Sequence, residues 1–306
     1  MEQAHAQVRL ERGERAHHGG QRTAERFGGA GQAALVGNLH EGLHGFEAIH
    51  GAIKPENAAV KSGKGYSFIW WKREESRPYP PEGLFMTENS TNTRQPAQPI
   101  QLFGSAISGH VHRVRFFLSV LGLPFEIVEL NLRQREHRTP EFLARNPFGQ
   151  VPVIEDGEVT LADSNAILVY LNERYAPDPA RWMPRDPVGA ARVQRWFSVA
   201  AGPLAYGPAA ARIMVLFGVD ADRTETVKRS HALLAVMETC LSEQPFLAGP
   251  SATLADIANY AYVAHAPEGS VSLDAYPQLR AWLARVEALP GFVPMVRTPV
   301  GLAAVA

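Results

Sequence analysis

The sequence predicts two structural domains, an α/β domain followed by an all-α domain. Between Pro99 and Tyr175, short apolar segments typical of strands alternate with segments whose apolar residues recur at helical spacing. After Asp186 the sequence has long helical patterns and no convincing strand. A proline-rich connection, APDPARWMPRDP, lies between the two regions and is typical of a linker. We therefore expect domains at residues 99–176 and 187–300.

The first domain is expected to follow the order β, α, β, α, β, β, α. The elements are strands in PIQLFG and over 125–130, a helix between them that ends at Gly122, a short helix from Thr139-Pro140, a hairpin at Asp156-Gly157 and a helix over 162–175. Strands separated by helices pair in parallel, whereas a hairpin pairs antiparallel. The pattern therefore predicts a mixed sheet.

The second domain is expected to be a helix bundle. Helical patterns cover 187–218 and 222–243, and two more begin near Thr253 and Tyr276. Thr253 and Asp256 are spaced as a capping box, in which the two side chains bond the free N–H groups at a helix start. This spacing favours a structural role for Asp256, and a catalytic carboxylate is the alternative.

Composition excludes several classes of function. The chain has 306 residues and a net charge of -1, and it has no basic block that would neutralise nucleic acid. We find neither an apolar run of about 18 residues that would span a membrane nor a signal segment. The single cysteine, Cys240, cannot form an internal disulfide and lies in a helical run, which favours a small core residue over a nucleophile. We expect a cytoplasmic protein.

The N-terminal region differs from the remainder. Residues 1–85 hold 13 of the 26 glycines and 6 of the 11 histidines, with no sustained helical or strand period. We interpret residues 1–98 as either a disordered extension or a mistaken start, and favour translation from Met86. His40 and His44 are spaced like metal ligands on a helix, but the neighbouring glycines disfavour that helix, and we predict no metal.

The stretch NPFGQVPVIEDGEVTLADS, which starts at Asn146, is predicted to bind a small ligand. Gly149 permits a sharp turn, and Pro152 lacks an amide hydrogen, which could leave the backbone of Val151 free to pair with a ligand. Asp163 and Ser164 begin a helix, where free N–H groups attract an anion while the aspartate favours an ammonium group. A small zwitterion would suit this stretch.

Four motifs carry a family resemblance. LFGSAISGHVHRV, REHRTPEFLARNPFGQVPVIEDG, LADSNAILVYL and TLADIA, in this order, resemble the cytosolic glutathione S-transferases, specifically the serine-type, phi-like or related bacterial class. The resemblance runs from Pro99 to the end of the chain and leaves 1–98 unexplained. It implies the glutathione transferase fold, with an α/β thioredoxin-like N-terminal domain and an all-α C-terminal domain.

The resemblance places the catalytic hydroxyl at Ser108, in the loop after the first strand. A hydrogen bond to a charged group contributes about 1.5 to 3 kcal/mol, which would lower the pKa of a thiol by about one to two units. Ser108 would donate this bond to the glutathione sulfur and keep its own proton. A plain helix cap is the structural alternative, and Ser105 is the nearest rival.

The resemblance also assigns residues to each part of glutathione. His137 and Arg138 would contact the glycine carboxylate, and a solvated charged loop is the alternative for these two residues. Gln150, Val151 and a cis Pro152 would hold the cysteinyl backbone. Asp163 and Ser164 would bind the γ-glutamyl end. His110 or His112 could line the sulfur site, although we expect His112 on the exposed side of its helix and assign neither as a base.

The function implied is conjugation of the glutathione thiolate to small hydrophobic electrophiles, as in detoxification, by a homodimer. Glutathione would be a co-substrate, with no further cofactor. The acceptor would lie between the domains against Ile107, Tyr206, Met214 and Phe217, although core packing explains these side chains equally well. A glutathione-dependent disulfide reductase or peroxidase, and a non-catalytic binding protein with the same fold, are the alternatives.

Overall fold

The computed structural model describes residues 95–305. The predictions for residues 1–85, for a start at Met86 and for the histidine pair His40 and His44 lie outside these residues.

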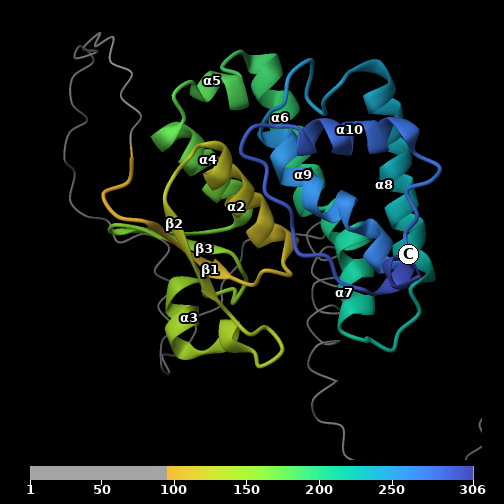
Figure 1. Cartoon of the computed structure of the whole chain (residues 1–306), viewed down its shortest axis with the longest axis horizontal. Coiled ribbons are helices and arrows are strands. Elements are labelled where there is room, and N and C mark those ends of the chain that lie inside the picture. Colours follow the sequence, from red (N-terminus) through yellow and green to blue (C-terminus); the bar gives the residue numbers. More distant parts are fainter. Residues whose placement is uncertain (1–94, 306) are drawn as a thin grey trace, which may run out of the picture. The chain divides into compact units, whose positions relative to one another are not determined.

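Four strands form one mixed sheet in the spatial order β2-β1-β3-β4 (Figure 1). They are β1 (Ile100–Gly104), β2 (Phe125–Glu129), β3 (Val153–Asp156) and β4 (Val159–Ala162). β1 pairs in parallel with β2 and antiparallel with β3, so that Leu102 at its centre lies opposite Ile127 on one side and Ile154 on the other. The turn between β3 and β4 uses Gly157 at a φ of 59°. The predicted mixed sheet with its terminal hairpin is confirmed.

Helices cover both faces of this sheet. Figure 1 shows α2 (Gly109–Val120) and α4 (Ser164–Tyr175) on one face and α3 (Pro140–Arg145) on the other. Thr139 accepts a hydrogen bond from the N–H of Phe142, so the predicted start of α3 is confirmed. The region predicted as a linker is partly helical, because Asp178 caps a short helix, α5 (Pro179–Trp182).

The remaining elements are helical. They are α6 (Pro187–Ala201), the π-helical turn η3 (Ala205–Ala209), α7 (Ala210–Leu216), α8 (Thr224–Glu243), α9 (Leu254–Ala264), α10 (Pro277–Glu287), and the 3-10 turns η2 (Glu136–Arg138), η4 (Ala266–Gly269) and η5 (Gly301–Ala304). The helical pattern predicted over 187–218 is confirmed, with two interruptions of its α-helical bonding. Gly202 ends α6, and the π-helical turn η3 contains Pro208, which has no N–H to donate.

Helix α9 is the buried centre of the helical domain and packs against both α6 and α2. The predicted capping box at its start is confirmed. Asp256 is fully buried and accepts hydrogen bonds from the N–H of Leu247, the N–H and hydroxyl of Thr253, and the indole N–H of Trp282. The carboxylate therefore joins the start of α9 to a preceding loop and to α10, which is the structural role predicted for it.

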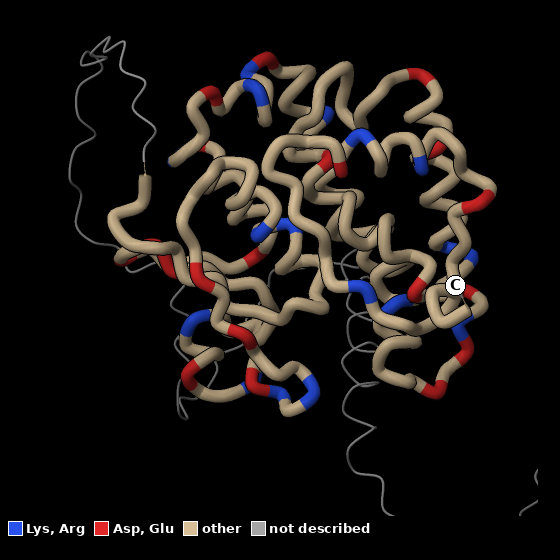
Figure 2. The backbone as a smooth tube through the Cα atoms, in the orientation of Figure 1, with Lys and Arg blue, Asp and Glu red and all other residues tan. Residues whose placement is uncertain are grey.

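One helical run in the described residues, Pro187–Leu216, is long and apolar enough by length and composition to cross a membrane. Half of its most apolar window is buried inside the protein, and α6 packs along α9. Packing inside the helical domain accounts for the buried half of this window. Acidic and basic positions are interspersed over the described chain (Figure 2).

His112 is buried, so the expectation that it lies on the exposed side of α2 is wrong. Its neutral ring donates from Nε2 to the carbonyl of Val293 at 2.7 Å and lies beside the rings of Phe116 and Tyr260. The C-terminal segment and α9 cover this face of α2, which the spacing within α2 could not reveal. Burial, with the charges of nearby basic residues, lowers the pKa of His112 to about 4, although the Val293 carbonyl opposes this shift.

We expect Asp256→Ala to lower the free energy of unfolding by about 4 kcal/mol, because it leaves several buried donors without an acceptor. Urea denaturation measures this change. Asp186→Ala is the matched control, since Asp186 caps the exposed start of α6, where losing a cap costs about 1 kcal/mol. Equal effects of the two substitutions would contradict the structural role of Asp256.

We expect the protein to lose stability as the pH falls from 7 to 5. The unfolded state protonates His112 near pH 6.5, whereas the folded state does so only near pH 4, so acid favours unfolding between these values. The loss from this residue should be about 2 kcal/mol at pH 5. His112→Gln keeps a donor for the Val293 carbonyl and should flatten the pH dependence measured by urea denaturation. An unchanged slope would contradict the low pKa of His112.

Candidate active site

Ser108 lies at the start of α2, where the chain leaves the sheet. Its oxygen accepts a hydrogen bond from the N–H of Val111 at 3.4 Å, and its own N–H bonds the carbonyl of Ser105. The side chain is 8% exposed, and its hydroxyl hydrogen has no acceptor among the described residues. Ser108 is therefore both a helix cap and a hydroxyl with a proton to donate.

Ser105, the rival candidate, is already engaged. Its hydroxyl donates to Oε1 of Glu129 at 2.8 Å, and both oxygens of that carboxylate also accept from the N–H of Ala106. Glu129 ends β2 and is brought here because β2 lies beside β1. A hydroxyl that donates to a carboxylate has no proton left for a second anion. The sequence analysis did not identify Glu129, because only the pairing of β2 with β1 brings its carboxylate to Ser105.

The backbone of Val151 has an N–H and a C=O available for a ligand. The Val151-Pro152 peptide is cis, as the resemblance implied. The side chain of Asn146 donates to the carbonyl of Gln150 at 2.8 Å, while neither backbone polar group of Val151 forms a hydrogen bond within residues 95–305. Val151 precedes β3, so its free N–H and C=O can pair with an extended peptide as an added strand would.

The start of α4 forms a second part of the site. Asp163 is its N-cap, at a φ of 71°, and accepts from the N–H groups of Asn165 and Ala166 at 2.9 Å each. Ser164 is buried, and its oxygen accepts from Nη1 of Arg113 at 3.1 Å. The helix start therefore presents a carboxylate beside a hydroxyl that a buried guanidinium polarises.

Arg113 and His110 reach Ser164 from α2. Arg113 also donates to Oδ1 of Asn165 at 2.9 Å, and Nδ1 of His110 lies 3.5 Å from the hydroxyl of Ser164. Burial lowers the pKa of Arg113 to about 10, so it stays charged at neutral pH. Burial, reinforced by Arg113, lowers the pKa of His110 to about 3, which makes His110 a poor acceptor for a thiol proton.

His137 and Arg138 lie in η2. Nη1 of Arg138 donates to the carbonyl of Phe148 at 3.1 Å, which ties this turn to the loop that leads into β3. Burial, followed by the charges of Arg138 and Arg135, lowers the pKa of His137. Arg138 also lies against Gly149, where a side chain would collide with it. The structure thus brings η2 to the loop that carries Val151.

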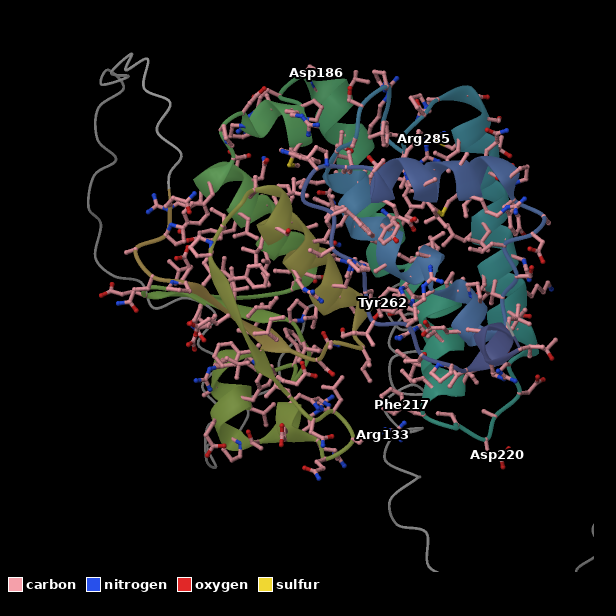
Figure 3. All side chains as sticks on the ribbon, viewed as in Figure 1. Arg133, Asp186, Phe217, Asp220, Tyr262 and Arg285 are labelled. Atoms are coloured by element: carbon pink, nitrogen blue, oxygen red, sulfur yellow. The ribbon has the colours of Figure 1, made fainter. Side chains whose placement is uncertain are left out.

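The predicted acceptor residues do not gather in one place. The carbonyl of Ile107 accepts from Arg212 of α7 at 2.7 Å, and Met214 is buried two residues further along α7. Phe217, at the end of α7, lies under the guanidinium of Arg133 from the first domain (Figure 3). Tyr206, in contrast, lines a groove of about 430 Å³ between α6 and α8, because the turn η3 separates it from the end of α7.

Within residues 95–305 there is no group of three or more His, Cys, Asp or Glu side chains that could hold a metal ion. Cys240 lies in α8, where its sulfur accepts from Gln244 at 3.4 Å. Burial raises the pKa of the Cys240 thiol, which disfavours the reactive thiolate.

Comparison with known proteins gives matches to both domains. The family described as Glutathione S-transferase, N-terminal domain matches residues 98–173, and Glutathione S-transferase, C-terminal domain matches residues 202–290. Glutathione S-transferase 3 of Zea mays is 34% identical over 210 residues, which cover 63% of this chain and 91% of the maize protein.

Solved structures agree with these matches. A glutathione S-transferase from Pseudomonas fluorescens is 33% identical with a TM-score of 0.61, and the match covers 65% of this chain and all of that one. A glutathione transferase homologue from Drosophila mojavensis, solved with bound glutathione, is 30% identical with a TM-score of 0.59, covering 63% and 89% of the two chains. The thioredoxin-like first domain and all-helical second domain are therefore confirmed, and the chain belongs to the glutathione S-transferase family.

Proposed function

We propose that this transferase conjugates glutathione to small hydrophobic electrophiles, with Ser108 as the hydroxyl that stabilises the thiolate. The choice of Ser108 over Ser105 rests on one observation. The Ser105 hydroxyl donates its hydrogen bond to Glu129, whereas the Ser108 hydroxyl has no acceptor among the described residues. Both serines are buried in the loop between β1 and α2. The difference between them is therefore one of bonding and not of exposure.

The reaction requires little from the protein beyond this bond. A free thiol with a pKa near 8.5 is mostly protonated at neutral pH, and the thiolate is the nucleophile. The Ser108 hydroxyl and the N-terminus of α2 would stabilise the negative sulfur. The thiol proton would pass to solvent. The thiolate would then attack an electrophilic carbon, forming a carbon–sulfur bond while the electron pair moves to a leaving group or into the acceptor.

The rest of glutathione would be held by backbone groups and helix starts. The free N–H and C=O of Val151, between Gln150 and the cis Pro152, would pair with the cysteinyl backbone. Asp163 would attract the γ-glutamyl ammonium, and Ser164 with the start of α4 would bind its carboxylate.

The glycine end and the acceptor would lie on either side of the sulfur. His137 and Arg138 in η2 are the basic groups for the glycine carboxylate. Ile107, Met214 and Phe217, from the loop and α7, would supply the apolar wall for the acceptor. Tyr206 lines a different groove and is not part of this proposed wall. Such a wall would select acceptors by size and polarity only, since apolar pockets discriminate weakly among similar molecules.

We expect Ser108→Ala to lower kcat/KM by about 10- to 100-fold at neutral pH, because losing a hydrogen bond to the thiolate raises its pKa by about one to two units. The assay is conjugation of 1-chloro-2,4-dinitrobenzene, with retention on immobilised glutathione as the binding readout. Retention should persist, since the other contacts remain.

Ser105→Ala is the matched control for this experiment. It removes a hydroxyl of the same loop and similar burial while Glu129 keeps its bonds to the N–H of Ala106. We expect a smaller loss of kcat/KM than in Ser108→Ala. The reverse order would overturn the assignment of Ser108. A disulfide reductase or peroxidase would instead oxidise glutathione in a coupled assay without forming a conjugate.

We also propose a cytoplasmic homodimer. The groove lined by Tyr206 exposes apolar side chains, with Val236 of α8 at 54% and Tyr206 at 41%. Apolar surface of this kind is often covered by a partner, and a second copy of the chain is the simplest one. We expect Val236→Glu to shift the mass measured by sedimentation toward the monomer. The wild-type protein sedimenting as a monomer would contradict the homodimer.

A further inference from the structure

An ion pair is buried between α7 and η4. Nε of Arg212 lies 2.7 Å from Oε2 of Glu268, and the two side chains are 2% and 4% exposed. Removing two charges from water costs several kcal/mol for each ion, and their attraction offsets this only when further hydrogen bonds satisfy both groups. Their remaining partners therefore indicate what the pair does.

Arg212 reaches out of its own domain. Its Nη1 donates to the carbonyl of Ile107 at 2.7 Å. Ile107 directly precedes Ser108, so this bond fixes one end of the peptide unit that leads into the serine. A guanidinium can do this because its donors point in different directions, with Nε toward Glu268 and Nη1 toward the loop.

Glu268 is held in turn by the C-terminal segment. Its Oε1 accepts from Nδ1 of His265 at 2.6 Å and from the N–H of Thr298 at 3.1 Å, and its Oε2 accepts from the hydroxyl of Thr298 at 2.5 Å. Gly269 lies so close to α7 that an added Cβ would be 2.6 Å from the backbone nitrogen of Arg212. The carboxylate therefore has little freedom to move.

The loop between β1 and α2 is thus tied from two sides. Glu129 holds Ser105 and Ala106 from within the sheet, and Arg212 holds Ile107 from the helical domain. The strength of a hydrogen bond falls steeply with poor alignment, so the direction of the next hydroxyl depends on how firmly this loop is fixed.

We propose that Arg212 is a positioning residue, which, held by Glu268, fixes the Ile107 carbonyl so that the hydroxyl of Ser108 points at the glutathione sulfur. This inference rests on the proposed role of Ser108. Arg212 acts through the loop and does not touch the thiolate. The other charged or titratable groups around the pair and the loop include His110, Arg113, Glu129, Tyr262, His265 and Arg297.

The test uses two variants that both lose the bond from Arg212 to the Ile107 carbonyl. One keeps the positive charge beside Glu268, and the other removes both charges of the ion pair. Arg212→Lys keeps a cation for Glu268, but one ammonium cannot reproduce both directed bonds. Arg212→Met with Glu268→Gln removes both charges together and leaves neither charge unpaired in the interior. The readouts are the pH dependence of kcat/KM and the ultraviolet absorbance of the bound thiolate, with unfolding followed by urea.

We expect both variants to raise the pKa of bound glutathione by about one unit, which is about a tenfold loss of kcat/KM at pH values below that pKa. Activity should recover at higher pH, and the KM for glutathione should change little. Asp256→Asn is the control, because it weakens the same helical domain without touching the loop. It should lower stability and leave the thiol pKa unchanged.

Folded Arg212 variants with an unchanged thiol pKa would overturn the inference. Equal shifts in the Asp256→Asn control would also overturn it, since general loosening would then explain the effect. Ser108→Ala is measured in the same series. A shift in Ser108→Ala alone would refute only the role of Arg212, whereas no shift in either would refute the assignment of Ser108 itself.

Discussion

The packing of α9 against α2 is the contact on which the rest of the structure depends. α9 is the buried centre of the helical domain, and α2 starts at Ser108. The two helices meet so closely that a Cβ at Gly109 would lie 2.8 Å from the ring of Tyr262. Because α2 is fixed between the sheet and α9, the backbone at Gly109 has one position, while the direction of the Ser108 hydroxyl depends on the loop before it. The cap at Asp256 secures α9 by joining it to a loop and to α10.

The site is assembled mainly from the ends of regular elements. The starts of α2 and α4 and the segment that leads into β3 each leave backbone groups without partners, and Ser108, Ser164 and Val151 lie at these three places. Basic side chains supplement this frame, with Arg113 buried beneath Ser164. This arrangement would suit a flexible tripeptide whose polar groups are spread along its length, since in the proposed binding mode each element end would contact a different part of the ligand.

Features encoded by neighbouring residues could be predicted from the sequence. The hairpin at Asp156-Gly157 and the capping box at Thr253 are local patterns, and the structure contains both. The burial of His112 could not be predicted, because the segment that covers it lies at Val293. The π-helical turn around Pro208 could not be predicted, because the apolar pattern continues through it. The bonds of Glu129 and Arg212 to the serine loop depend on strand register and helix packing, so no spacing in the sequence indicates them.

The anchor of the serine loop has a consequence for the order in which the protein becomes competent. Every group proposed to hold glutathione lies in the α/β domain, which the ribosome makes before the helical domain. The bond that steadies Ile107 comes from a residue 105 positions later, and Thr298, which holds Glu268, is made later still. A nascent chain would therefore bind the tripeptide before the Ser108 hydroxyl is oriented toward the glutathione sulfur. Full catalytic activity would thus depend on residues made late in the helical domain.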